Sequence, residues 1–512
     1  MSDGDPRNDS LSRRDAVARL AAAGSAAVLG TARGASAADV PSQPSVASPL
    51  RNVIQAENAR PGTRDWMITN VAIDPATKYR SPAIEGYCSH ASVRAGDTLA
   101  IFVSTRPASR FTIEIYRTGW YGGDGGRLMA RLGEFPGSEQ PDPPVGEKRL
   151  RRCTWTPATE LTIPADWPSG VYLGKLTSLA EGRQSYAVFV VRDDRKADFL
   201  LQASDFTWQA YNRWPDQFAL YDDGKNQWYW GGGVQVGFDR PYGKYCQIVD
   251  QPLSVGSGEW FLWEFPLAYW MESQGYDVSY ISNLDTHRDP AGLLRARGLL
   301  SVGHDEYWTI EMFRNVQAAI AAGVNVAFLS GNAVCGRIVL DERQRSFERV
   351  GVYGPPGGTR EFASMSSLAH ERPYANELIG AHSTGPVTGG ADWICTRPDH
   401  WVHAGTGMQQ GDAIPGLIGW EWHGDPAPIP SLEVVATGPT QASGKPNGGT
   451  YTATVYTGPK GNYVFNAATC WWADGLAAPP GYVRPSVYTS PRGPDERVQR
   501  ITHNLLQRAM ER

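Results

Sequence analysis

The middle of the chain carries polar side chains that can bind a metal ion or transfer protons. His304, Asp305 and Glu306 come directly after the short apolar run 299–302, and Asn332 closely follows the apolar run 324–329. Imidazole, carboxylate and amide groups can bind metal ions, and imidazole and carboxylate groups also serve in acid–base catalysis. Taken alone, each of these residues is as readily explained as a loop cap, so the structural elements around them decide which chemistry is available.

The elements that hold these residues are expected to form a strand–helix–strand unit. Between the two apolar runs, residues 310–322 have helical spacing, with Ile310, Phe313, Val316 and Ile320 on one side. This pattern predicts a right-handed unit with two parallel strands that are buried on both faces. Ligands bind at the carboxyl ends of the strands in open α/β sheets. We therefore expect an imidazole, two carboxylates and an amide in one crevice.

Two further residues extend this set. The apolar run 199–202 predicts another strand, and Tyr211 follows it closely enough to lie near the same sheet edge as His304. Glu421, near the end of a strand predicted over 414–422, is the other candidate. Together these patterns predict an α/β domain over residues 196–512.

The turn 329–333 limits the kind of catalysis that we expect. It stands where class I glutamine amidotransferase-like folds carry a nucleophilic cysteine on a strand-to-helix elbow, and we predict an open α/β sheet of that type. Here the position is Asn332, which cannot act as that nucleophile, and Cys335 is predicted to face the following helix. Covalent thiol catalysis is therefore not expected.

From residue 84 to residue 195 the sequence predicts only β-strands. Short alternating runs separated by turn residues recur, as at 98–103, 111–117 and 185–191. This is typical of a sandwich, and we predict an all-β, immunoglobulin-like one. Cys88 and Cys153 both fall in it and are the expected disulfide pair. Residues 38–83 are predicted to be a linker and lead-in segment.

The first 37 residues have the features of an export signal. Arg13 and Arg14 precede a mildly apolar run over 16–30, and an ASA cleavage pattern follows at 35–37. This predicts twin-arginine export to the exterior, the cell wall or the periplasmic space. No later stretch is long and apolar enough to suggest a membrane span after cleavage. The 48 basic and 53 acidic residues give a net charge of −5, so no nucleic-acid-binding stripe is expected.

Several motifs resemble the N,N-dimethylformamidase large (beta) subunit family. The resemblance runs from about residue 54 to the C-terminus and lies in these motifs: DWPSGVY at 166–172, WQAYN at 208–212, FDRPY at 238–242, VGHDEYW at 302–308, SGN at 330–332 and GDAIPGL at 411–417. It implies an iron-dependent hydrolase of a carboxamide or related C–N bond. In the characterised enzyme of that family, a mononuclear Fe³⁺ is held by two tyrosines and one glutamate.

The resemblance also implies which residues bind the ion. Tyr211 matches the first tyrosine ligand, and Glu306 matches the glutamate. The second tyrosine position falls at Phe238 or at Tyr242, four residues further on. Tyr242 is the only nearby substitute and is taken as the third ligand; the match at Phe238 stays open and would leave the iron site one ligand short.

His304, Asn332 and Glu421 match the family's positions beside the ion and the substrate. For hydrolysis of the C–N bond, we expect Glu421 to accept a proton from the attacking water molecule while His304 orients that water. The amide of Asn332 would donate to the oxygen that becomes negatively charged.

Two other interpretations stay open. The 18 tryptophans are compatible with a non-catalytic exported module that binds glycan or cell wall, and a metal-free crevice would favour it. Alternatively, His304 and Glu306 act as an acid–base pair in a metal-free hydrolase or lyase, which full activity after chelation would favour. The expected partners are a small amide-type substrate and either a small subunit, as in the family enzyme, or further copies of this chain.

Overall fold

Two β-sheets fill the first part of the described chain. The computed structural model describes residues 52–226, 228–244, 251–356, 368–442, 445–483 and 493–511, so the predicted export signal and Cys246 lie outside it. One sheet has the strand order β2 (Ser92–Val93), β8 (Gln184–Val191), β7 (Gly170–Ser178), β4 (Phe111–Thr118) and β5 (Gly126–Phe135). The other has the order β1 (Glu85–Cys88), β3 (Thr98–Ser104) and β6 (Pro157–Thr162).

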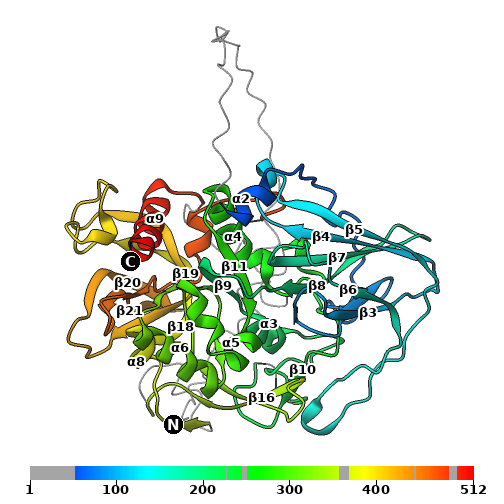
Figure 1. Ribbon diagram of the computed structural model, residues 1–512. Coiled ribbons are helices and arrows are strands. Elements are labelled where there is room, and N and C mark those ends of the chain that lie inside the picture. The colour runs from blue at the N-terminus through cyan, green and yellow to red at the C-terminus, as the bar shows by residue number, and fades with distance from the viewer. Residues whose placement is uncertain are drawn as a thin grey trace, which may run out of the picture. The chain divides into compact units, whose positions relative to one another are not determined.

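Alternating side chains of these two sheets share one apolar core. Leu99, Ile101 and Val103 of β3 pack with Ile113 and Ile115 of β4. Strand alternation places every second side chain on the same face, which is the pattern that predicted a sandwich. Figure 1 shows β4, β5 and β7 as neighbouring strands. The immunoglobulin-like assignment stays a prediction.

A nine-stranded sheet organises the rest of the chain. Five strands are parallel, in the order β11 (Val278–Ser282), β9 (Ala197–Ala203), β12 (Ala296–Gly303), β14 (Asn325–Ser330) and β22 (Tyr463–Asn466). Four antiparallel strands continue it, in the order β21 (Lys445–Thr457), β20 (Glu433–Ala442), β18 (Ala381–Ile394) and β19 (Ala413–Pro426). The chain is therefore mixed α/β. Assignment to the glutamine amidotransferase-like type stays a prediction.

The predicted strand–helix–strand unit is present as β12, α6 (Ile310–Ala322) and β14. Thr309 caps α6 by accepting a hydrogen bond from the backbone N–H of Met312 at 3.1 Å. Both faces of the unit are buried. Leu299 packs with α6 in one apolar cluster, whereas Leu300 on the opposite face packs in a second cluster with α4 and α9.

The remaining helices cover this sheet or join it to the first two sheets. They are α2 (Val53–Asn58), α3 (Asp205–Tyr211), α4 (Phe265–Ser273), α5 (Asn283–Arg288), α8 (Asn376–Ile379) and α9 (Glu496–Met510), and the π-helical turn η4 (Trp260–Glu264) leads into α4. Asp495 caps the start of α9 by accepting a hydrogen bond from the backbone N–H of Arg497 at 2.8 Å. Within the described ranges, no helix has both the length and the apolar character needed to cross a membrane.

A small separate sheet lies beyond the carboxyl end of β12. Its strands are β10 (Gln235–Gly237), β16 (Ser346–Val352), β15 (Gly336–Leu340) and β13 (Tyr307–Trp308), and β17 (Ala369–His370) pairs with β16. Because β13 follows Glu306 directly, this sheet fixes the chain on the far side of the predicted site residues.

The expected disulfide between Cys88 and Cys153 is wrong, because both cysteines are free and buried. Cys88 packs in the core shared by the first two sheets. Cys153 packs with Tyr87, Trp155 and Trp214 in a different cluster. Tyr87 and Cys88 are adjacent on β1, so their side chains point to opposite faces, and only Tyr87 faces Cys153.

Candidate active site

The carboxyl end of β12 turns sharply at Gly303. This residue has φ +72°, and a Cβ atom placed on it would lie 2.3 Å from Cβ of Trp263. Only glycine fits both the backbone conformation and the space. The turn directs the next three residues out of the sheet, and His304 and Glu306 lie completely buried beyond it.

Asp305 does not share the crevice that the sequence predicted for it. Its carboxylate accepts hydrogen bonds from Gln202 Nε2 at 2.6 Å, Ser301 Oγ at 2.8 Å and Asn283 Nδ2 at 3.1 Å. These donors come from the ends of β9 and β12 and from the start of α5. Asp305 therefore stabilises the turn through these three hydrogen bonds, whereas the side chains of His304 and Glu306 point toward the site.

Glu306 meets Tyr211, as the sequence predicted. The Tyr211 hydroxyl lies 2.5 Å from Glu306 Oε2. Tyr211 is the last residue of α3, and the same helix holds the turn through Thr207, whose Oγ1 accepts a hydrogen bond from the Glu306 N–H at 3.0 Å. One short helix thus fixes both the carboxylate and the phenol.

A second tyrosine, Tyr221, completes this group and was missed from the sequence. Its hydroxyl lies 2.6 Å from the Tyr211 hydroxyl and 3.2 Å from Glu306 Oε2, and the two phenol rings stack with centroids 4.6 Å apart. Tyr221 lies in a loop without apolar periodicity. The only sequence signal is that LYD at 220–222 loosely repeats AYN at 210–212.

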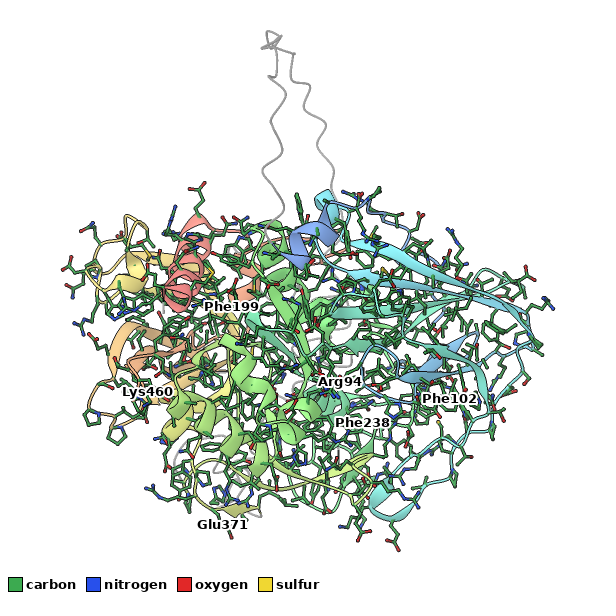
Figure 2. The ribbon with its side chains drawn as sticks, in the orientation of Figure 1. Arg94, Phe102, Phe199, Phe238, Glu371 and Lys460 are labelled. Atoms are coloured by element: carbon green, nitrogen blue, oxygen red, sulfur yellow. The ribbon has the colours of Figure 1, made fainter. Side chains whose placement is uncertain are left out.

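The structure does not bring Tyr242 to this group, which corrects the predicted third ligand. The Tyr242 ring packs edge-on against Trp208, with centroids 6.1 Å apart. Phe238, labelled in Figure 2, packs against Phe206 and Phe347. The segment 238–242 therefore packs against residues outside the Tyr211–Glu306 group, whereas the loop after α3 folds back onto that group.

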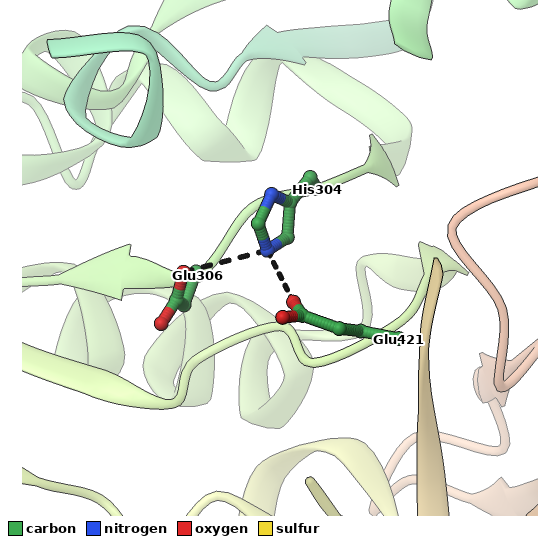
Figure 3. A group of neighbouring side chains, drawn as sticks. All are labelled: His304, Glu306 and Glu421. Carbon is green, nitrogen blue, oxygen red and sulfur yellow. Dashed lines mark ion pairs between the residues drawn. The ribbon is translucent and has the colours of Figure 1, made fainter. Parts of the chain in front are cut away.

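His304 and Glu421 form an ion pair beside Glu306. His304 Nε2 lies 2.5 Å from Glu421 Oε2 and 3.4 Å from Glu306 Oε2, and both contacts are drawn in Figure 3. Burial opposes a charge on the imidazole, but the Glu421 carboxylate and the hydrogen bonds to both glutamates outweigh it and raise the pKa of His304 well above its ordinary value. The imidazole of this pair therefore favours its protonated form.

Asn332 reaches the same glutamate from the end of β14. Its Nδ2 donates a hydrogen bond to Glu421 Oε2 at 3.0 Å. The residue has φ +49°, an uncommon value for a side chain other than glycine. At the preceding Gly331, a Cβ atom would lie 2.1 Å from the backbone oxygen of Glu421, so the turn packs tightly against β19.

His423 holds the other side of this turn. Its Nε2 accepts a hydrogen bond from the backbone N–H of Ala333 at 3.0 Å, and its Nδ1 lies 2.6 Å from Asn466 Oδ1. Burial lowers the pKa of His423 to about 4, so this imidazole is neutral. The Ala333 N–H is therefore already used within the turn.

The oxygens of Tyr211, Tyr221 and Glu306 are of the type that binds a hard metal ion. Burial raises the pKa of the Tyr211 and Tyr221 phenols well above the ordinary value, and the adjacent Glu306 carboxylate adds to this effect. A cation at the three oxygens would supply the missing positive charge. The group His304, Glu306 and Glu421 also has ligand atoms within 4.8 Å of one another. Glu306 belongs to both sets.

The structure thus brings five of the six predicted site residues together: Tyr211, His304, Glu306, Asn332 and Glu421. Each of them is at most 2% exposed. Tyr242 is the exception, and Tyr221 is the tyrosine that lies beside Tyr211 and Glu306 instead.

One family model matches most of the chain. The model is described as N,N-dimethylformamidase beta subunit-like, C-terminal, and it matches residues 112–485. The match includes all of the site residues described above. No curated protein matches the chain.

Proposed function

The chain belongs to the N,N-dimethylformamidase beta subunit-like family, and from that premise we propose that it is a metal-dependent hydrolase of a carboxamide or related C–N bond. The observation that supports this most is the buried contact of Tyr211, Tyr221 and Glu306 beside the His304–Glu421 ion pair. Buried phenols and carboxylates in direct contact are unusual unless they hold a cation or do chemistry.

The proposed ion is one Fe³⁺, with Tyr211, Tyr221 and Glu306 as its ligands. Two phenolates and one carboxylate carry three negative charges, which balance a ferric ion. A free tyrosine has a pKa near 10, so a strong Lewis acid is needed to keep two of them ionised at neutral pH. Hard oxygen ligands also suit a hard cation better than a soft one.

The remaining residues supply acid–base and oxyanion chemistry. A bound ion of this kind contributes Lewis acidity, which polarises an amide carbonyl and makes a water molecule more acidic. The Glu421 carboxylate accepts the proton of the attacking water, and His304 keeps that carboxylate in place through the 2.5 Å ion pair. The Asn332 amide donates to the carbonyl oxygen as its negative charge develops.

Three further parts of the proposal concern the whole protein. The family description names a beta subunit, which supports a second, smaller subunit as a partner. The arginine pair and apolar run within residues 1–37 support export by the twin-arginine route. The substrate is a small amide.

Amine release from a panel of small formamides and acetamides tests the proposal. We expect the iron-loaded protein to release amine, the chelated protein to be inactive, and added iron to restore the activity. Full activity after chelation would instead favour a metal-free acid–base mechanism at His304 and Glu306. No activity towards any amide, in a protein that retains its iron, would contradict the hydrolase assignment.

A further inference from the structure

A third buried phenol, Tyr307, lies against Tyr221. It directly follows Glu306 and belongs to β13, and its side chain is completely buried. The Tyr307 hydroxyl lies 2.5 Å from the Tyr221 hydroxyl. Three tyrosines therefore stand in contact at this site, although the charge argument above requires only two as ligands.

A buried arginine contacts the other side of Tyr307. Nη1 of Arg349, on β16, donates a hydrogen bond to the Tyr307 oxygen at 2.8 Å. A guanidinium group has donors only, so the Tyr307 oxygen must be the acceptor in this contact. Its own single hydrogen then points to the Tyr221 oxygen, which is its other partner among the described residues.

Arg349 is held so that it cannot swing away. Its Nη2 donates to the backbone oxygens of Tyr229 at 3.0 Å and Gly231 at 3.1 Å. The guanidinium also lies over the Tyr221 ring, with its central carbon 5.1 Å from the ring centroid. No carboxylate pairs with it in the part of the chain that the structure describes, so its charge faces the phenols.

We propose that Tyr307 is a positioning residue that donates a hydrogen bond to the Tyr221 oxygen, and that Arg349 enforces this direction. Each group then donates a hydrogen bond to the next in one direction: Arg349 to Tyr307, Tyr307 to Tyr221, Tyr221 to Tyr211, and Tyr211 to Glu306. This arrangement keeps the third phenol out of the ligand set and aims the Tyr221 oxygen at Glu306. The consequence for a bound ion rests on the proposed function, whereas the hydrogen bond itself does not.

The first experiment tests the hydrogen bond in the metal-free protein. The unfolding equilibrium is measured for Tyr307→Phe, Tyr221→Phe and the double variant. We expect the effects to be non-additive by about fivefold in the equilibrium constant, the size of one hydrogen bond. Tyr353→Phe is the matched control, because its buried hydroxyl donates to the Trp308 backbone oxygen instead, and it should add independently to Tyr221→Phe. Additive effects of Tyr307→Phe and Tyr221→Phe would overturn the proposal.

The second experiment uses Fe³⁺ as the probe and reads the visible absorption band of iron tyrosinate. Tyr307→Phe should keep one iron per chain, and its band should move to longer wavelength, because a phenolate that loses a hydrogen bond is a stronger electron donor. Tyr353→Phe should leave the band in place. Loss of iron in Tyr307→Phe would make Tyr307 a ligand, and an unmoved band would remove its positioning role.

Failure of the Tyr307→Phe variant to fold and failure of the wild type to bind iron have different consequences. If Tyr307→Phe does not fold, the resonance Raman spectrum of the iron-loaded wild type in deuterated solvent tests the hydrogen bond to Tyr221 instead. The phenolate bands of Tyr221 should shift in deuterated solvent if this phenolate accepts a hydrogen bond, and unshifted bands would overturn the proposal. If the wild type takes up no iron, the metal centre under the proposed function fails. The unfolding cycle still decides whether Tyr307 donates to Tyr221.

Discussion

Glu421 has two neighbours that fix its role at this site. The His304 imidazolium pairs with one of its oxygens, and the Asn332 amide donates to the same oxygen. Neither contact involves a phenol oxygen, so Glu421 can act as the proposed general base without serving as a metal ligand. The roles of ligand and base can therefore be separated by substitution.

Glu421→Gln should retain the metal ion and slow amide hydrolysis by about a hundredfold to ten-thousandfold, the usual contribution of a general base. Metal content and kcat are measured on the same preparation. Glu371→Gln is the control, because that carboxylate is exposed and pairs with Arg337 instead of with a site residue. Loss of the ion in Glu421→Gln would show that Glu421 is itself a ligand.

His423 should make the folded protein sensitive to acid. Its pKa falls to about 4 in the folded state, because burial disfavours the charged imidazole, whereas the unfolded value is near 6.5. Between these values the unfolded chain binds more protons, so stability is lost as the pH falls from about 6.5 to about 4. The difference is on the order of 1–3 kcal/mol.

His423→Gln removes the titrating group, and its side-chain oxygen can accept the Ala333 hydrogen bond. Urea unfolding at pH 7 and at pH 4.5 should show a smaller loss of stability in this variant than in the wild type. Equal losses in the two proteins would mean that His423 is not the source of the acid sensitivity.

At the scale of elements, the turn after β12 decides whether the site forms. Gly303→Ala places a methyl group into the Trp263 side chain and forces a residue with a Cβ atom to φ +72°. The backbone conformation costs about 1–2 kcal/mol and the overpacking about 1–3 kcal/mol more. Gly96→Ala, at φ +86° with open space around it, carries only the first cost. Thermal unfolding should therefore show a larger loss for Gly303→Ala, together with loss of metal binding; equal losses would contradict the packing argument.

The elements nearest the site were predictable because they carry strong apolar periodicity. The strands β12 and β14 are buried on both faces, whereas α6 buries one face, so their apolar spacing indicates their type. The residues that follow the two strands reach a common edge of the sheet. Tyr221 was not predictable in this way. It lies in an irregular loop that folds back through a hydrogen bond from the Leu220 N–H to the Ala210 oxygen at 2.9 Å, and no local pattern encodes that contact.

The lack of a local sequence pattern also explains why the positions of Tyr242 and Asp305 were predicted wrongly. The resemblance at 238–242 suggested Tyr242 as the tyrosine nearest to Phe238, but the Tyr242 ring packs on Trp208. Asp305 stands between two site residues, yet hydrogen-bond donors from the ends of β9 and β12 and the start of α5 turn it away. Which side a loop residue faces depends on partners far away in sequence, and a single sequence does not show those partners.

At the scale of the whole molecule, a buried ion pair joins the first sheets to the α/β part. Nη2 of Arg117, on β4, lies 2.7 Å from a Glu272 oxygen on α4, and neither side chain is exposed. Asn58 and Tyr280 also donate to Glu272, at 2.8 Å and 2.7 Å. The two parts are therefore coupled through one carboxylate.

Glu272→Gln should destabilise the protein by about 3–5 kcal/mol, because it leaves the Arg117 guanidinium buried without a counter-charge. Glu134→Gln breaks the exposed pair with Arg110 and should cost less than about 1 kcal/mol. Calorimetry measures both. A change in melting temperature no larger for Glu272→Gln than for Glu134→Gln would show that the interface does not depend on this charge.

The most direct test of the central claim is the iron content and visible spectrum of three proteins: the wild type, Tyr221→Phe and Tyr242→Phe. We predict one iron per chain and a tyrosinate band in the wild type and in Tyr242→Phe, and a band at least halved in Tyr221→Phe. A wild type that binds no iron, or a band that is lost in Tyr242→Phe and kept in Tyr221→Phe, would contradict the assignment of Tyr211, Tyr221 and Glu306 as the metal site.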